Sequence, residues 1–119
     1  MIKLLFTFSL LFGFIFSSCI KEKAKTDYKV EVTSASEPID YIVLNKAYDG
    51  NGGSTNYAPN STEWTQEFEA QRKDVTIEVD ANCFDSNFEP QSITIKIYRK
   101  GKLVKEVVGS GNVEAKYED

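Results

Sequence analysis

The sequence predicts an all-β domain that follows a removable export signal. Three observations support this prediction: a short apolar run near the N-terminus, apolar residues that alternate with polar ones over much of the remaining chain, and turn-forming residues between the alternating runs. No long stretch shows helical spacing. Without its signal, the 119-residue chain is long enough for one domain of ordinary size but not for two.

The N-terminus has the form of a signal peptide. Lys3 precedes a largely apolar run, residues 4–16. As a helix this run would rise about 20 Å, which is less than the roughly 30 Å hydrocarbon core that a permanent span must cross. Residues 16–19, Phe-Ser-Ser-Cys, resemble the lipobox of bacterial lipoproteins. We therefore expect residues 1–18 to be cleaved and Cys19 to carry the lipid; the alternative is an ordinary secretory signal that leaves a plain thiol.

The segment after Cys19 is expected to be a polar tether, residues 19–26, that holds a folded domain at residues 27–119. Two or more acyl chains would anchor it stably to a bilayer. The Cys-Ile-Lys-Glu sequence at residues 19–22 is similar to surface-export signals of Bacteroidetes lipoproteins. The expected location is therefore the outer membrane, on its periplasmic or surface face. The formal net charge of −4 argues against a nucleic-acid partner, because phosphate contacts need clustered Lys or Arg.

Alternation with a period of two predicts the strands, since it places the apolar members of each run on one face. The run at residues 39–47 is apolar on both faces, which favours a central position in a sheet. Trp64 is expected to anchor the core, and Gly101 to allow a tight reversal. The number and spacing of the runs indicate a small immunoglobulin-like β-sandwich of about seven antiparallel strands. The expected strands cover residues 28–32, 39–47, 64–70, 75–81, 93–98, 103–108 and 112–117.

The first long connection, residues 48–61, contains the run Asp49-Gly50-Asn51-Gly52-Gly53. Such a run favours an irregular, mobile loop over regular structure. Loops on a rigid sandwich often carry binding sites. With Tyr48 and Tyr57 at its ends and Asp49 between them, this loop is a candidate site for a sugar or peptide; a plain hairpin connection is the alternative.

The second long connection, residues 80–90, is rich in side-chain oxygens. Asp80, Asn82, Asp85 and Asn87 are candidate calcium ligands, because calcium takes six to eight oxygen ligands from a shaped loop. The EF-hand pattern is absent, since Asp85 stands where its glycine would be and Gln91 where its glutamate would be. The alternative is that Asp and Asn serve the backbone of turns.

The composition argues against an enzyme. The chain has no histidine, so it has neither a Ser-His nor a Cys-His nucleophile pair, nor an imidazole metal ligand. Cys83 has no disulfide partner if Cys19 is lipidated, and we expect it to pack as a small apolar residue. We therefore expect no catalytic residues and no cofactor.

One resemblance reaches the folded domain. Residues 92–106, Ser-Ile-Thr-Ile-Lys-Ile-Tyr-Arg-Lys-Gly-Lys-Leu-Val-Lys-Glu, with Gly111 and the Val-Glu-Ala-Lys-Tyr of residues 113–117, resemble the C-terminal hairpin and final strand of MmpS-type transport accessory proteins. Residues 64–68 and 74–77 are similar to the segment that precedes this hairpin in the proteins of that family. The resemblance implies a small β-sandwich outside the membrane that assists a large exporter of lipids or siderophores. This chain departs from the family in having a predicted lipid anchor in place of a membrane helix, and no cysteine in the hairpin.

Two functions are therefore expected. In the first, a monomeric, non-catalytic accessory domain docks on an envelope protein complex through a strand edge or a sheet face, for example around Lys96 and Tyr98. In the second, a surface lipoprotein binds a carbohydrate, a peptide or Ca²⁺ through its loops.

Overall fold

The computed structural model describes residues 26–48, 51–70 and 74–119; the predicted signal peptide, Cys19 and Asp49 lie outside these ranges. Every regular element in the described part is a strand, and all strand pairs are antiparallel, which confirms the all-β prediction. None of the described residues forms a helix long and apolar enough to cross a membrane. The strands are β1 (Thr26–Ser34), β2 (Tyr41–Tyr48), β3 (Asn51–Tyr57), β4 (Glu63–Ala70), β5 (Val75–Cys83), β6 (Ser92–Arg99) and β7 (Lys102–Glu118).

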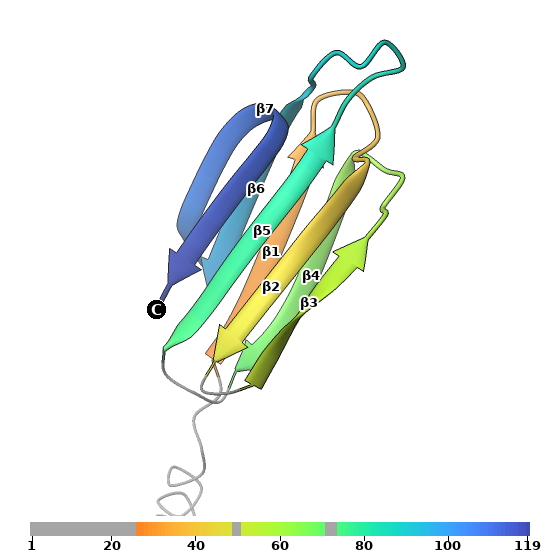
Figure 1. Ribbon diagram of the computed structural model, residues 1–119. Helices are drawn as coiled ribbons and strands as arrows, with labels where there is room; N and C mark the ends of the chain where they lie inside the picture. The colour runs from red at the N-terminus through yellow and green to blue at the C-terminus, as the bar shows by residue number, and fades with distance from the viewer. Residues whose placement is uncertain (1–25, 49–50, 71–73) are drawn as a thin grey trace, which may run out of the picture.

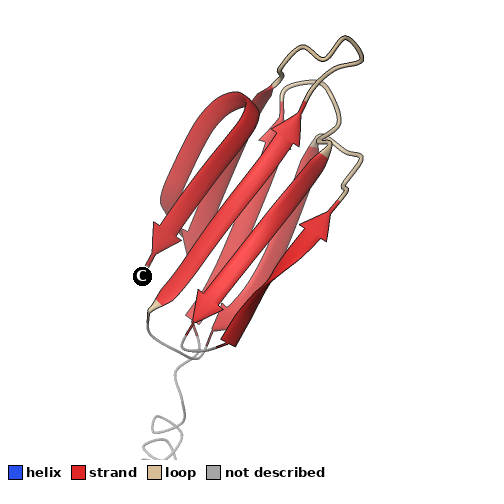
Figure 2. Cartoon of the chain, viewed as in Figure 1, coloured by secondary structure: helices blue, strands red, loops and turns tan. Residues whose placement is uncertain are grey.

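The strands form one strongly curled sheet in the order β3-β2-β5-β7-β6-β1-β4 (Figure 1). Strand β7 pairs with β6 along its first half and with β5 along its second half, so it passes from one layer of the curl to the other. Figure 2 shows strands in both layers and loops confined to their ends. The fold is a half-barrel, so the predicted immunoglobulin-like sandwich is confirmed in class and strand number, while its two separate sheets are not clearly present.

The core lies between the two layers and follows from the alternation. Strand β5 is the clearest case, because buried and half-buried residues alternate along its whole length. A shift of one residue would turn its buried side chains to solvent, so burial fixes the register. Each buried Val or Ile contributes about 1.5–3 kcal/mol. The other core residues are Tyr28, Val30, Val32, Ile39, Ile42, Leu44, Ala70, Ile93, Ile95, Ile97, Val113 and Ala115.

The strand number agrees with the prediction, but two elements differ. Residues 51–57, predicted as part of a mobile loop, form β3, so that interpretation is wrong. The register pairs Tyr48 with Asn51, so β2 and β3 form a hairpin whose connection is two residues long. Gly52 fits there because its φ is +144° and a Cβ would meet the Lys46 carbonyl oxygen at 2.0 Å. In addition, the two strands predicted at residues 103–108 and 112–117 are one continuous β7.

Two predicted core positions are less buried than expected. Trp64 is half-buried on the edge strand β4, where its ring packs 4.9 Å from that of Tyr57. Strand β2 does lie inside the sheet, between β3 and β5. Its second face is nevertheless not covered, because Tyr41 is 42% exposed. The apolar residues on both faces of residues 39–47 therefore do not mean that both faces of β2 are buried.

A polar cluster ties four strands together at one end of the domain. The Tyr28 hydroxyl donates to Asp119 Oδ2 at 2.5 Å, and Arg99 Nε donates to the same oxygen at 2.8 Å. The Asp119 N–H donates to the carbonyl of Val75 at 2.9 Å. Burial, followed by the hydrogen bond to Asp119, raises the pKa of Tyr28 to about 12, and that hydrogen bond lowers the pKa of the Asp119 carboxyl.

We predict that this cluster makes the protein unstable at high pH. The folded pKa of Tyr28 is about 12 against an ordinary value of 10.0, so the stabilisation is complete below pH 10 and is lost as the pH rises through 12. Wild-type protein should lose about 1–3 kcal/mol of unfolding free energy over that interval. Tyr28→Phe, which has no proton to lose there, should lose less. Urea titrations at several pH values would measure this difference.

The matched control is Tyr41→Phe, because Tyr41 is exposed on another strand. It should keep the wild-type dependence on pH. If the unfolding free energy of Tyr28→Phe fell with pH as steeply as that of the wild-type protein, Tyr28 would not hold its proton as the structure indicates.

Candidate functional site

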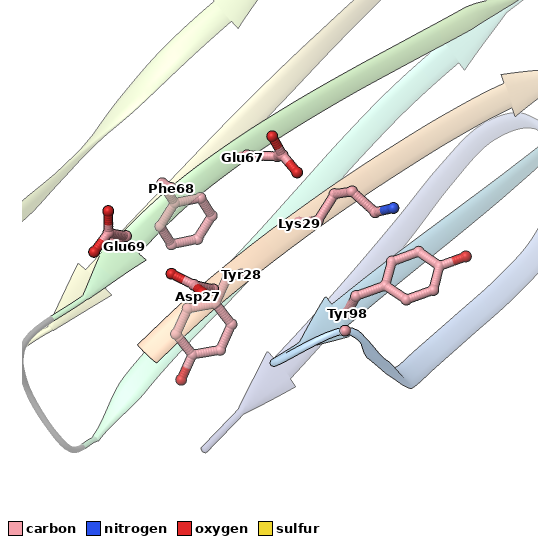
Figure 3. Close-up of a pocket in the computed structure, with 8 residues that line it drawn as sticks. Asp27, Tyr28, Lys29, Glu67, Phe68, Glu69 and Tyr98 are labelled. Atoms are coloured by element: carbon pink, nitrogen blue, oxygen red, sulfur yellow. The ribbon is translucent and has the colours of Figure 1, made fainter. Parts of the chain in front are cut away.

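A depression of about 490 Å³ lies over strands β1, β4 and β6 and the turn that follows β6 (Figure 3). Its charged side chains and Tyr98 come from outward-facing positions of the three strands, whereas Tyr28 and Phe68 face inward, because inward and outward residues alternate. It is therefore built on a paired, rigid part of the sheet. The lining residues are Asp27, Tyr28, Lys29, Glu67, Phe68, Glu69, Tyr98 and Gly101.

Strand register brings the lining residues together. Lys29 on β1 lies opposite Glu67 on β4 and opposite Tyr98 on β6. Its Nζ is 4.5 Å from the centroid of the Tyr98 ring and 3.7 Å from Glu31 Oε2. Figure 3 shows the Lys29 side chain extending toward Tyr98. The ammonium group is thus directed by a carboxylate and an aromatic face together.

A hydrogen bond to Glu31 is the main cause that raises the pKa of Tyr98, and it holds the Tyr98 hydroxyl beside the Glu31 carboxylate. Asp27, two residues before Lys29 on β1, and Glu67, opposite Lys29 on β4, add carboxylates to the depression. Together these groups can accept and donate hydrogen bonds and pair with charges of either sign. Such a surface can bind a polar or charged partner.

The predicted ligand-binding residues of the first connection are not brought together. Asp49 lies outside the described residues. Tyr48 pairs with Asn51 at one end of the β2–β3 hairpin, whereas Tyr57 pairs with Ile42 at the other end. At about 3.3 Å per residue, the two ends of β3 are about 20 Å apart. The half-buried Tyr57 ring packs against Trp64, and the Tyr57 backbone lies at the other end of the hairpin from that of Tyr48.

The predicted calcium ligands are divided between a strand and a turn. Asp80 and Asn82 lie on β5, while Asp85 and Asn87 follow it. Asp85 Oδ1 accepts the backbone N–H groups of Asn87 at 2.8 Å and Glu89 at 2.9 Å, which confirms the turn-forming alternative for this residue. Within residues 26–48, 51–70 and 74–119, no three His, Cys, Asp or Glu side chains gather closely enough to hold a metal ion.

Cys83 is buried at the end of β5, as expected for a packing residue. Its thiol contacts the carbonyl oxygens of Pro38 at 3.4 Å and Glu37 at 3.5 Å. Burial, followed by the charge of Asp40, raises the pKa of the thiol. Both effects disfavour the reactive thiolate.

A second groove, of about 320 Å³, lies on the outer face of β2, β5 and β7. It includes the exposed Tyr41, and it places Asp80 directly opposite Glu114. Sequence reasoning singled out Tyr98 in the first hollow and Asp80 and Asn82 in the second, but it predicted neither hollow. The alternation of apolar and polar residues predicts which residues face outward. It does not show which strands pair, and each hollow lies over three paired strands.

The comparisons with known proteins give no relative: no protein-family model matches the chain, and no curated protein matches its sequence.

We predict that Asp85 stabilises its turn without a metal. Asp85→Ala removes the acceptor of two backbone N–H groups, so the unfolding free energy should fall by about 1 kcal/mol. Amide exchange at Asn87 and Glu89 should accelerate. Millimolar calcium should leave the Tm of both proteins unchanged. The control is Asp80→Ala on the adjacent strand, and a calcium-dependent rise in Tm that is lost in Asp85→Ala would contradict this role.

Proposed function

We propose that this protein is a lipid-anchored, non-catalytic binding domain of the bacterial outer membrane that docks on a larger envelope complex, such as a transport system. The observation that carries the proposal is the position of the depression. Asp27, at one end of it, directly follows Thr26, the first residue of β1. The candidate docking surface therefore lies at the end of the domain next to the predicted tether.

The sequence supports anchoring at that end. Six residues, 20–25, separate the predicted lipid site Cys19 from Thr26. Six extended residues span at most about 20 Å. A domain held so close to the bilayer presents the Asp27 end of β1 toward proteins embedded in the same membrane. A protein partner of the membrane complex is thus favoured over a free ligand for this surface.

The three longest described loops, residues 35–40, 58–62 and 84–91, lie at the opposite end of the domain (Figure 1). There Phe88 is 85% exposed and has a φ of +60°, a strained conformation for a large aromatic residue. The turn that carries it is closed by hydrogen bonds between Asp85 and both Phe88 and Glu89. This observation favours a second candidate function, in which the loops bind a peptide or carbohydrate away from the membrane.

Chemical crosslinking of membranes from cells that express single variants tests the two functions. The mature wild-type protein should begin at Cys19, its mass should include acyl chains, and it should crosslink to a membrane protein. Cys19→Ala should lose both the acyl mass and the crosslink. Tyr98→Ala should keep the lipid but reduce the crosslink at least tenfold, because the Lys29 side chain loses the ring that directs it. Phe88→Ala should retain the lipid and the crosslink.

An unmodified, soluble wild-type product would contradict anchoring. A crosslink that survives in Tyr98→Ala but disappears in Phe88→Ala would contradict docking through the depression and support binding through the loops.

A further inference from the structure

Among the described strands, β3 and β4 stand at the two ends of the curled sheet, and each pairs with one neighbour only. A free strand edge presents unpaired backbone groups to any extended segment that comes near. The two edges differ in charge. Strand β3 (Asn51–Tyr57) contains no charged residue, whereas β4 (Glu63–Ala70) contains three glutamates at its exposed positions. Only the β4 edge therefore selects a partner by charge.

The hydrogen bonds show which backbone groups of β4 point away from β1. The Ser34 N–H of β1 donates to the Thr62 carbonyl, so Thr62 turns its backbone groups toward β1. In an antiparallel ladder this direction alternates with a period of two. Thr65 and Glu67 consequently point their N–H and C=O groups away from β1. In agreement, the Glu67 carbonyl accepts from the side chain of Gln66, at 3.4 Å.

The side chains of β4 divide into an acidic face and an aromatic face. Glu63 and Glu67 point outward, and within the described residues neither carboxylate is paired with a cation. Trp64 and Phe68 point inward and are half-buried; the Trp64 ring packs against Tyr57 of β3, and the Phe68 ring stacks on Tyr28. The Lys46 Nζ also lies 4.6 Å from the centroid of the Phe68 ring. A strand added at this edge would place alternate side chains opposite the carboxylates and beside the aromatic rings.

We propose that the β4 edge binds an extended segment of a partner protein in which basic side chains alternate with apolar ones. The partner's backbone pairs with Thr65 and Glu67, its basic side chains face Glu63 and Glu67, and its apolar side chains cover Trp64 and Phe68. Glu67 also lines the depression, so the edge and the depression form one surface. The inference rests on the proposed function, since it identifies the chemistry of the partner that the anchored domain holds.

A second copy of the chain fits this edge less well. Two β4 strands paired in antiparallel fashion would bring glutamates of one copy next to glutamates of the other, and like charges in neighbouring cross-strand positions are destabilising. Strand β3 of another copy offers no basic residue to the carboxylates.

Binding of a synthetic peptide to the non-lipidated chain, Cys19→Ala, tests the proposal by calorimetry or fluorescence. The probe alternates lysine and valine and is as long as β4, which has eight residues. One control has the same composition in two blocks; a second replaces lysine with glutamate. The alternating peptide should bind at least tenfold more tightly than either control. Methylation of alternate backbone nitrogens on one edge of the peptide should abolish binding without any change to the protein.

Two protein variants locate the peptide. Thr65→Pro removes an N–H that points away from β1, a position where an edge strand tolerates proline, and it should weaken binding at least tenfold while the Tm stays near that of the parent. Glu67→Gln should weaken binding several-fold and reduce its dependence on salt. The matched control Glu114→Gln, on the outer face of β7, should bind as the parent does.

Equal binding of the alternating and block peptides, or full binding of the methylated peptide, would overturn the proposal. So would dimerisation of the free protein that Thr65→Pro abolishes, because a second copy would then occupy the edge. If the peptide fails to bind while the membrane crosslink persists in Thr65→Pro, the edge is not the docking surface and the proposed function stands. If the peptide binds but no membrane crosslink forms, the proposed function fails and the edge chemistry stands.

Discussion

Strand β7 pairs with β6 through residues 102–110 and with β5 through residues 111–118, and this double pairing joins the two layers of the domain. The change of partner occurs at Gly111, where φ is +76°. A Cβ at this position would lie 3.0 Å from the Pro90 Cβ and 3.2 Å from the Phe84 ring. Glycine is therefore required both for the backbone conformation and for the close approach of the loop that precedes β6.

This connection determines where the free surfaces of the molecule lie. Because β7 occupies the middle of the sheet, the strands farthest from it, β3 and β4, become the edges. The curl then places the inner faces of β1 and β6 against those of β2 and β5, and the core contains no buried polar or charged residue among those described. Charged residues are consequently concentrated on the outer faces and edges, where the depression and the acidic edge of β4 are found.

The sequence was sufficient to predict the strands in which apolar and polar residues alternate strictly. Alternation in β1, β5 and β6 predicted these strands and their buried faces. The alternation did not predict the strands correctly where glycines determine the backbone conformation. Asp49-Gly50 is a typical two-residue hairpin connection, yet the glycines after it favoured a loop and concealed β3. Likewise, Gly109 and Gly111 suggested a break in what is one strand, because a glycine at positive φ can turn a strand toward a new neighbour without ending it.

The candidate site could not be predicted in the same way. Lys29 and Tyr98 are adjacent only because β1 pairs with β6, which follows it by about sixty residues in the sequence, and alternation carries no information about that pairing. The predicted calcium ligands are divided between two elements for a related reason. Asp80 and Asn82 looked like loop residues but continue β5, and Asp85 uses Oδ1 to order its own turn.

Amide hydrogen exchange of Gly111→Ala beside wild-type protein tests most directly whether β7 joins the layers. If it does, the variant should lose about 1–3 kcal/mol of stability, and protection should fall by the same factor at Ile95 in one layer and at Val79 in the other. If protection falls in one layer while the other keeps its wild-type protection, the layers are stable independently, and the change of partner at Gly111 is not the constraint on which the fold depends.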